Sequence, residues 1–293
     1  MLGGLLNNYQ GGLWELPFAD VVNTAVDWVI DTLAPIFFIV KIVTQFILNN
    51  LVVFFTWLPW WAMVTIITLV AWKLANWRIA LFAAFGMYLI GMFGLWELAM
   101  ETLALVITSV LISTGAGIPL GILCALNDRV WNIVRPILDA MQTMPAFVYL
   151  IPAVMLFGIG RVPGTMATVI YALPPAVRLT NLGIRQVPSD LVEAGKAFGS
   201  TRTQLLLKIQ LPLAMPAIMA GVNQAILLAL SLSVLASMIA AGGLGREVLM
   251  ALGQVDAGRG FIAGLSIVLL AMIIDRISQS LGSKKERTRT MQP

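Results

Sequence analysis

The sequence offers few side chains that could perform catalysis or hold a transition metal. It contains no histidine and one cysteine, Cys124, whose apolar neighbours are typical of a small buried hydrophobic residue. A catalytic triad with a histidine base is therefore excluded, and a transition-metal site is not expected. The chain also lacks the Gly-x-x-x-x-Gly-Lys-[Ser/Thr] run that cradles nucleotide phosphates, so it should not hydrolyse ATP itself. We predict no catalytic residue, no metal and no cofactor bound by this chain.

The most suggestive polar segment is the insert from Gly183 to Pro212, which has the pattern of a helical hairpin. Its first helix should open at Pro188-Ser189-Asp190, with Glu193 three residues after Asp190 as in a capping box. Gly199 suits the left-handed residue that stops a helix. The sequence thus predicts a short capped helix that ends at Gly199.

A second helix should follow directly and complete the hairpin. Thr201 is followed by Gln204 at capping-box spacing, and Pro212 is expected to end this helix. With Lys196 and Arg202 around an apolar face, the hairpin could dock onto a partner and transmit force. An amphipathic loop lying on lipid headgroups fits the same pattern equally well.

The composition identifies the elements that hold this insert as membrane helices. Of the 293 residues, 59% are hydrophobic and 11% are charged, and the mean hydropathy is +0.92. A soluble domain carries roughly a quarter charged residues, so this chain needs lipid as its solvent. We expect an all-α integral membrane protein. Seven spans of suitable length are predicted, at Leu58–Leu74, Ile79–Leu95, Leu103–Leu126, Ile137–Ile159, Thr165–Leu182, Leu213–Ile239 and Phe261–Leu281.

The basic residues predict how these spans are oriented. With the C-terminus inside, 14 of the 18 Lys and Arg residues fall in inner segments. The other four, Lys41, Arg161, Arg246 and Arg259, fall outside, and the reverse orientation would invert the positive-inside bias. The insert 183–212 and the basic tail 282–293 are therefore expected on the cytoplasmic side, and the N-terminus outside.

The N-terminal region, 1–57, has two interpretations. Polar residues at helical spacing between Asp27 and Asn49 favour one or two amphipathic helices on the outer membrane surface, divided near Pro35. The alternative is that Leu33–Trp57 forms an eighth span, which would move the N-terminus inside.

Six tryptophans fall at the proposed span ends, where amphipathic rings prefer to lie. They are Trp57, Trp60, Trp61, Trp72, Trp77 and Trp96. Cages for quaternary ammonium groups also use tryptophan, but we favour the interfacial belt for these residues.

The insert also carries a family resemblance. Its residues match the spacing of the "EAA" loop of ABC importer permeases, which is EAA, three residues, G, nine residues, I, one residue, LP. The matching residues are Glu193-Ala194-Gly195, Gly199, Ile209 and Leu211-Pro212. Gly195 replaces the second alanine, which leaves the backbone path open. The resemblance implies that an ATPase partner is coupled through Glu193, Ala194, Gly195, Lys196, Phe198, Gly199, Ile209, Leu211 and Pro212.

Further stretches resemble the permeases of bacterial proline/glycine betaine ABC importers (ProW-type). They are Arg135–Leu150, Gln210–Gln224, Ala236–Ala240 with Gly242–Gly245, and Asp275-Arg276, within a similarity that runs from about Ala25 to Leu281. The resemblance implies the MetI-like fold of type I importers. Residues 103–281 would form the transport core, and 58–102 would be peripheral helices.

The same resemblance implies the partners and the location. Two permease copies would assemble with two ABC ATPase subunits, which hold ATP and Mg²⁺, and with one periplasmic or extracellular substrate-binding protein. The complex would lie in the bacterial inner membrane in contact with lipid, with no nucleic-acid partner. The cargo would be a quaternary-ammonium osmolyte, such as glycine betaine, proline betaine or a choline-like solute.

Methionine and aromatic faces accommodate methylated ammonium groups, which suggests residues for the transport path. The candidates are Met141, Met144, Phe147, Tyr149, Tyr171, Asn223 and Gln224. Helix–helix packing is the alternative role for each of them. A permease for another small solute remains an alternative, as does an ion-coupled transporter, although convincing midplane acids and inverted repeats are not found.

Four ionisable residues lie within or near the spans, and such residues are functional candidates. They are Asp139, Arg178, Asp275 and Arg276. All lie in the inner half, so we expect pairing or snorkelling to the inner surface. The outer Gly242–Gly245 loop either contacts a binding protein or turns the chain.

Overall fold

The protein is helical throughout the part that the computed structural model describes, which is the backbone of residues 18–290 and most side chains between 20 and 280. No strand occurs within that range, which confirms the all-α prediction. In chain order, the elements are α1 Phe18–Trp57, α2 Trp60–Leu74, α3 Trp77–Met92, α4 Trp96–Leu126, α5 Asp128–Thr143, the 3₁₀ turn η1 Ala146–Tyr149, α6 Leu150–Phe157, α7 Arg161–Arg185, α8 Ser189–Ala197, α9 Arg202–Leu205, the π-helical η2 Leu206–Gln210, α10 Leu211–Ala236, the 3₁₀ turn η3 Ser237–Ile239, α11 Leu244–Gln254 and α12 Ala257–Thr290.

The chain divides into two compact units, residues up to Val40 and residues from Lys41 onward. Among described residues, the first unit consists only of the N-terminal part of α1. In the second unit, Leu48 and Phe55 of α1 are buried in a core cluster with residues of α2, α3 and α4. This unit contains all the candidate site residues.

Helix α7 lies at the centre of the second unit and packs closely between α4 and α10. A Cβ atom built on Gly121 of α4 would lie 2.6 Å from the Cβ of Thr180. One built on Gly221 of α10 would lie 3.0 Å from the carbonyl oxygen of Pro175, and one on Gly183 of α7 would lie 2.7 Å from the Cβ of Ala217. Small residues at these crossings bring the backbones together, as is common between membrane helices.

Helices occupy every region where a span is predicted, but the structure does not confirm the count of seven. Among the described residues, four helices are long and apolar enough to cross a membrane by length and composition: Val26–Trp57, Trp96–Leu126, Arg202–Ile239 and Ala257–Ser280. Helices α2 and α3 are shorter, with 15 and 16 residues, and α7 is not in that set. Many residues of α7 are buried against protein, so part of its surface is sheltered from lipid.

Within the expected span Ile137–Ile159, the chain bends sharply at Met144-Pro145. The α5 helix and the segment Ala146–Phe157 meet at 112°. Pro145 cannot continue the hydrogen-bond ladder, and it forces the preceding Met144 into an extended conformation with ψ of 136°. The segment is therefore a bent pair of helices, and by length and composition the two arms together still suffice for one broken span.

The expected division of the N-terminal region at Pro35 is also wrong, because α1 continues through that residue. Apolar helices tolerate an internal proline when the freed carbonyl is satisfied locally. The stretch Val26–Trp57 is long and apolar enough to cross a membrane, as the eighth-span alternative requires. Residues 1–17 of the expected region 1–57 lie outside the described residues.

Two other expected boundaries fall inside helices. The boundary between 102 and 103 lies within α4, which begins at Trp96. The tail 282–293 continues α12 as far as Thr290, and its last three residues lie outside the described part.

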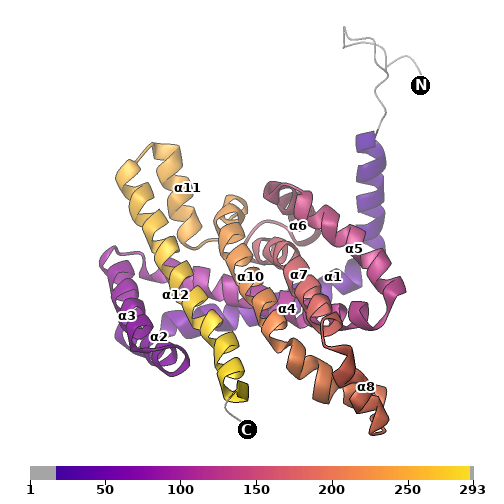
Figure 1. Ribbon diagram of the computed structural model, residues 1–293. Helices are drawn as coiled ribbons and strands as arrows, with labels where there is room; N and C mark the ends of the chain where they lie inside the picture. Colours follow the sequence, from indigo (N-terminus) through magenta and orange to yellow (C-terminus); the bar gives the residue numbers. More distant parts are fainter. Residues whose placement is uncertain (1–17, 291–293) are drawn as a thin grey trace, which may run out of the picture. The chain divides into compact units, whose positions relative to one another are not determined.

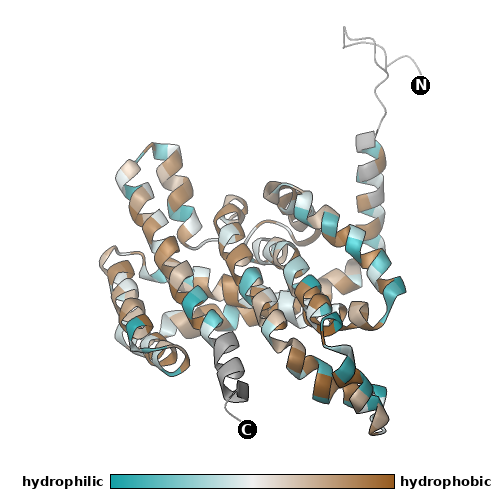
Figure 2. Cartoon of the chain, viewed as in Figure 1, coloured by the Kyte–Doolittle hydropathy of each residue, from teal (hydrophilic) through white to brown (hydrophobic). Residues whose placement is uncertain are grey.

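Opposite ends of the second unit differ in character. Figure 1 shows the α8 hairpin and the C-terminal end of α12 at one end, and the α11–α12 turn at the other. Figure 2 shows polar residues concentrated on α5 and α8, whereas α3 and α10 are largely apolar. The polar hairpin and the end of α12 thus lie at the same end of the unit, as the predicted topology requires of two segments on one side of a membrane.

Candidate functional site

The insert after α7 forms a hairpin whose first arm is α8 and whose second arm is α9 with η2. The turn between the arms has the predicted left-handed residue, Gly199, with φ of +76°. The Ser200 N–H donates to the Gly195 carbonyl at 3.1 Å, and the Gly199 N–H donates to the Lys196 carbonyl at 2.9 Å. The predicted helix stop at Gly199 is confirmed.

One of the two predicted capping boxes is present. The Gln204 N–H donates to Thr201 Oγ1 at 3.3 Å, and the Thr201 N–H donates to Gln204 Oε1 at 2.9 Å. The box predicted for Asp190 and Glu193 is wrong. Helix α8 begins at Ser189 after Pro188, so both acidic residues lie inside the helix.

Gly195 lets the two arms of the hairpin pack tightly. It is the buried residue of α8, and a Cβ built on it would lie 2.6 Å from Ile209 Cδ1 and 2.8 Å from Leu205 Cδ1. Those atoms are the flexible ends of side chains, so an alanine would require only that they rotate away. The departure from the EAA pattern at Gly195 is therefore compatible with the hairpin fold.

The base of the hairpin is continuous with the core. Leu206 and Leu211 pack against a buried cluster made by Ile184 of α7 with Ala214 and Ile218 of α10. A displacement of the hairpin would therefore also displace the ends of α7 and α10, which are closely packed helices of the core.

The expectation that Pro212 ends the second arm is wrong. The arm passes through the π-helical turn Leu206–Gln210 directly into α10, and Pro212 lies in the first turn of that helix. Because proline has no N–H to donate, it fits the first turn of a helix. The Leu211 N–H donates to the Leu206 carbonyl, in the wider pattern of a π turn.

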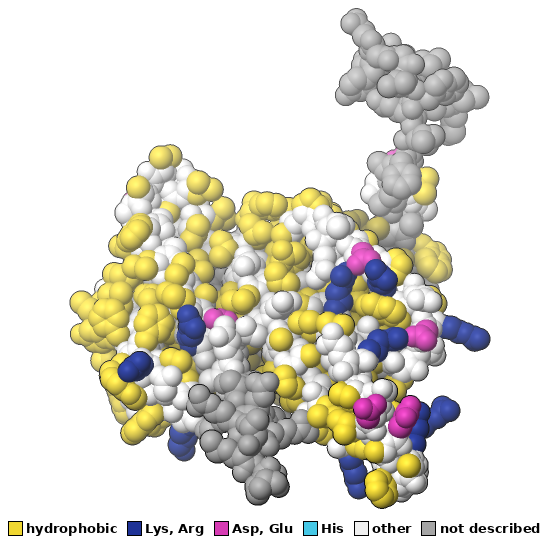
Figure 3. Space-filling view, viewed as in Figure 1, with side chains coloured by type: hydrophobic (Ala, Val, Ile, Leu, Met, Phe, Trp, Pro, Cys, Tyr) yellow, Lys and Arg dark blue, Asp and Glu magenta, His cyan; other side chains and the backbone are white. Residues whose placement is uncertain are grey.

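The outer face of the hairpin carries exposed side chains that have no partner among the described residues. Phe198 is 90% exposed, and Glu193, Ala194 and Lys196 are exposed beside it. No ion pair within the described residues involves Glu193 or Lys196. Figure 3 shows charged side chains gathered over this hairpin and over α5. The face thus combines one aromatic knob with unpaired charges of both signs, which suits a protein partner.

Three of the predicted path residues meet at the α5–α6 bend. The rings of Tyr149 and Tyr171 lie edge to face, 5.7 Å apart between centroids, and the Tyr149 hydroxyl donates to the Met141 carbonyl. Tyr149 is buried, whereas Met144 and Phe147 at the same bend are exposed. The bend therefore gathers the aromatic and methionine candidates.

The other two path candidates lie on α10. Asn223 donates from Nδ2 to Asp275 Oδ1 at 3.1 Å and accepts a hydrogen bond from the Ser278 hydroxyl. Gln224 is exposed beside it. Asn223 thus joins α10 to α12 and has a structural role that its residue type alone did not indicate.

Of the four ionisable residues predicted in the inner half, Asp139 and Arg178 are paired with each other, which is one of the two expected outcomes. Asp139 forms an ion pair with Arg178, and Arg135 Nε lies 3.9 Å from its second oxygen. Asp275 accepts hydrogen bonds from Asn223 and from Gln279 Nε2, the latter at 2.8 Å to Oδ2. Arg276 is exposed.

Sequence reasoning missed Arg185, which connects the end of α7 to the α4–α5 junction. Its guanidinium donates to the Cys124 carbonyl at 2.8 Å, to Asp128 Oδ1 at 2.6 Å and to Asn181 Oδ1 at 2.8 Å. The available signal was an arginine in the last turn of a helix, where it can reach carbonyl oxygens. It fixes α7 immediately before the hairpin begins.

The Gly242–Gly245 loop, which leads into α11, is fastened to the first turns of α4. The Gly243 N–H donates to Glu101 Oε2 at 3.0 Å, and the Leu244 N–H donates to Thr102 Oγ1 at 2.8 Å. Glu101 also forms an ion pair with Arg161 of α7. This loop therefore joins α4, α7 and α11.

Comparison with known proteins identifies the protein family to which this chain belongs. A family model described as "Binding-protein-dependent transport system inner membrane component" matches residues 117–287, which include the hairpin and the helices that hold it. The chain belongs to this family of membrane components of transport systems.

Individual relatives and a solved structure show more closely which proteins this chain is similar to. The chain is 48% identical over 267 residues to the glycine betaine/proline betaine transport system permease protein ProW of Escherichia coli (strain K12), covering 91% of this chain and 75% of the relative. It is 47% identical to the glycine betaine transport system permease protein OpuAB of Bacillus subtilis (strain 168), covering 93% and 96%. A solved inward-facing structure of the MetNI methionine ABC transporter superimposes with a TM-score of 0.58 at 22% identity, over 67% of this chain and 96% of that one. This last likeness confirms the predicted fold.

Proposed function

We propose that this chain is the membrane-spanning permease subunit of an ATP-driven importer for quaternary-ammonium osmolytes such as glycine betaine and proline betaine. The names of the Escherichia coli and Bacillus subtilis relatives support this cargo. The chain does not itself catalyse a reaction. ATP and Mg²⁺ would be held by a separate ATPase subunit.

The exposed hairpin is the observation that carries the proposal. Phe198 extends from it into solvent, and Glu193 and Lys196 lie beside it without an ion-pair partner in the described residues. A large exposed aromatic residue with charges around it is typical of a binding anchor. We assign this face, residues Glu193–Gly199, as the surface that binds the ATPase subunit.

The packing of the hairpin explains how an ATPase could drive transport. Its base is joined through Leu206 and Leu211 to α7 and α10, and α7 is packed closely against α4. When the ATPase dimer closes, the hairpin would move with it and carry these helices between inward-open and outward-open states. The two states must differ in their affinity for the ATPase and for a substrate-binding protein, because only such a difference shifts the equilibrium.

The assembly would contain two copies of this chain, two ATPase subunits and one external binding protein. The hairpin would face the cytoplasm, in agreement with the concentration of basic residues on that side of the predicted topology. The cargo would pass Met141, Tyr149 and Tyr171 at the α5–α6 bend, with Met144 and Phe147 exposed beside them.

Uptake by the reconstituted complex tests the proposal. The chain is placed in liposomes with its ATPase and binding protein, and uptake of labelled glycine betaine is measured together with ATP hydrolysis. Phe198→Ala and Glu193→Ala should each lower uptake about tenfold, the effect of losing one interface anchor. Their thermal unfolding should be unchanged, because both side chains are exposed.

Phe261→Ala is the matched control, since this phenylalanine on α12 is also highly exposed and lies outside the hairpin. Full uptake by both hairpin variants would contradict the coupling assignment. Normal coupling to a different solute, with no uptake of glycine betaine by the unmodified complex, would contradict only the cargo.

A further inference from the structure

A pocket of about 640 Å³ lies between α2, α3 and α4, apart from the hairpin and from the predicted path. The N-terminal ends of α2 and α4 and the C-terminal end of α3 meet there. The pocket is therefore at one end of the helix bundle, where membrane helices meet headgroups and water. Its volume is within the range of small-molecule sites.

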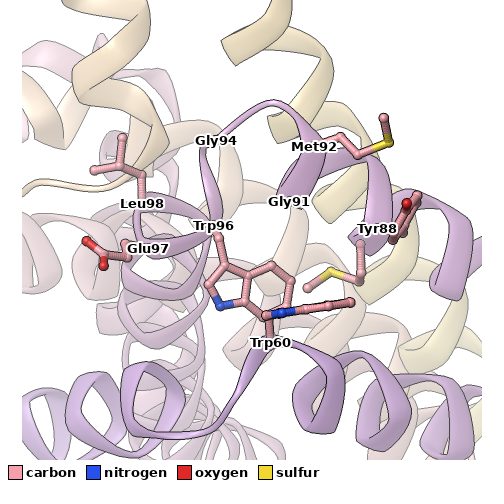
Figure 4. A pocket seen from close by; sticks show the side chains of 9 residues that line it. Trp60, Tyr88, Gly91, Met92, Gly94, Trp96, Glu97 and Leu98 are labelled. Atoms are coloured by element: carbon pink, nitrogen blue, oxygen red, sulfur yellow. The ribbon is translucent and has the colours of Figure 1, made fainter.

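Aromatic rings and sulfur form much of the pocket lining. Figure 4 shows Trp60 and Trp96 close together, with Tyr88 and Met92 on one side and Glu97 on the other. The centroids of the Trp60 and Tyr88 rings are 6.5 Å apart and the rings are tilted by 51°, so they form a corner. A cation in this corner could lie within about 6 Å of both ring centroids, which is the range of cation–π attraction.

The lining contains a carboxylate but no basic side chain. Glu97 forms no ion pair with any described residue. Trp77 differs, because the guanidinium of Arg78 already lies over its ring at 5.7 Å from the centroid. The pocket thus offers a cation aromatic faces and one negative charge, and none of the described residues supplies a cation there.

The lining also discriminates among cations. Apart from the Glu97 carboxylate, its side chains offer one further acceptor, the Tyr88 hydroxyl, and otherwise indole N–H donors, aromatic faces, methionine sulfur and apolar carbon. A primary ammonium ion is strongly hydrated and needs hydrogen-bond acceptors to replace its water. A trimethylammonium group has no N–H to satisfy and binds aromatic faces directly.

We propose that this pocket binds a trimethylammonium group, with Trp60, Tyr88 and Trp96 as its aromatic walls and Glu97 as its counter-charge. The group belongs either to a free solute or to the headgroup of phosphatidylcholine. The inference shares its ligand class with the proposed function, but it depends only on this pocket. Trp60 and Trp96 are therefore ligand-binding residues, whereas Trp77 serves as an anchor at the membrane boundary.

Binding to the purified full-length chain, without ATPase or binding protein, tests this site. Saturation-transfer NMR follows the trimethyl protons of choline, and the control ligand is 3,3-dimethylbutan-1-ol, a neutral carbon analogue. Choline should bind at least about tenfold more tightly than the neutral analogue, as expected for a desolvated cation–π site. Trp60→Leu and Glu97→Gln should each weaken choline binding about tenfold, whereas Trp60→Phe, which keeps an aromatic face, should weaken it less.

Trp77→Leu is the matched control and should leave choline binding unchanged. Nanodiscs made with phosphatidylcholine or with phosphatidylglycerol alone distinguish the two sources. Weaker choline binding in phosphatidylcholine identifies the lipid headgroup as the occupant, and equal binding identifies a free solute. Equal binding of the neutral analogue, or unchanged binding in both Trp60→Leu and Glu97→Gln, would overturn the proposal. Neither result would affect the uptake test, because transport is measured in the complete complex.

Discussion

The hairpin of α8, α9 and η2 and the junction around the Gly242–Gly245 loop are built on opposite principles. At the junction, the backbone N–H groups of Gly243 and Leu244 are bonded to Glu101 and Thr102, and Glu101 is paired with Arg161. On the hairpin, the residues that face outward are exposed, and its charged groups form no ion pairs within the described residues.

The difference indicates that the junction stabilises the folded chain, whereas the outer face of the hairpin is suited to bind a partner. A junction that satisfies its own polar groups contributes to the folded chain and loses stability when it is altered. Exposed side chains on the outer face of the hairpin contribute little to the stability of the chain. Substituting them should therefore weaken the binding of a partner more than it lowers the stability of the chain. Stability measurements on the two regions can therefore separate their roles.

Gly243→Ala should cause the largest loss of stability. Gly243 has φ of +74°, and a Cβ built on it would lie 2.5 Å from Thr102 Oγ1. The strained backbone and the overlap together should cost about 2–4 kcal/mol. Thermal unfolding of the purified chain in detergent measures the loss. A Cβ built on Gly253 of α11 meets nothing within 4 Å, so Gly253→Ala should not destabilise the chain. Equal effects of the two substitutions would contradict the stabilising role of the junction.

Glu101→Ala should have the next largest effect. It removes the acceptor of the Gly243 N–H and the ion-pair partner of Arg161, and Glu101 is only 21% exposed. We expect about 1–3 kcal/mol, because a buried donor and a charge are left without a partner. Asp128→Ala is the matched control: this carboxylate pairs with Arg185 but is 79% exposed, so its loss should change unfolding little. A larger effect at Asp128 would contradict our ranking.

Gly199→Ala should have a smaller effect on unfolding, because only backbone strain opposes it. Gly199 has φ of +76°, but a Cβ there meets nothing within 4 Å. The expected cost is about 1–2 kcal/mol. Gly199→Asn should cost less, since asparagine tolerates the left-handed region. If the two variants unfold alike, contacts rather than strain govern this turn.

Thr201→Ala should have the smallest effect, about 1 kcal/mol, because it removes the side-chain half of one capping box. Thr201→Ser retains the oxygen and should unfold like the unmodified chain. Thr203→Ala, two residues further along and exposed, provides a control outside the cap. Loss of stability in the serine variant would show that the threonine methyl group, not the cap, is responsible.

The sequence predicted the geometry of the hairpin well where that geometry depends only on residues within one turn of each other. Gly199 and the Thr201–Gln204 pair act within one turn of backbone, and both have the predicted geometry. The Asp190–Glu193 pair had the same spacing but no function as a cap, because Pro188 is the N-cap and the helix begins at Ser189, one residue before Asp190. A motif at the right spacing is therefore insufficient where a neighbour can move the helix start.

Predictions were weaker where distant segments meet. The hydropathy of Ile137–Ile159 indicated a span, but the 112° bend at Met144-Pro145 could not be derived from the residues alone. The partners of Asn223 lie on a helix more than 50 residues away. Neither hydropathy nor motif spacing contains that information.

The sequence by itself determined that this is an all-helical membrane protein with a capped hairpin that carries an EAA-type motif. Those properties depend on composition and on contacts within one or two turns. Only the tertiary structure decided that Trp60, Tyr88 and Trp96 line one pocket with Glu97, and that α7 is enclosed by α4 and α10. These features depend on how closely particular helices approach one another, which small residues such as Gly121 and Gly221 permit but do not specify.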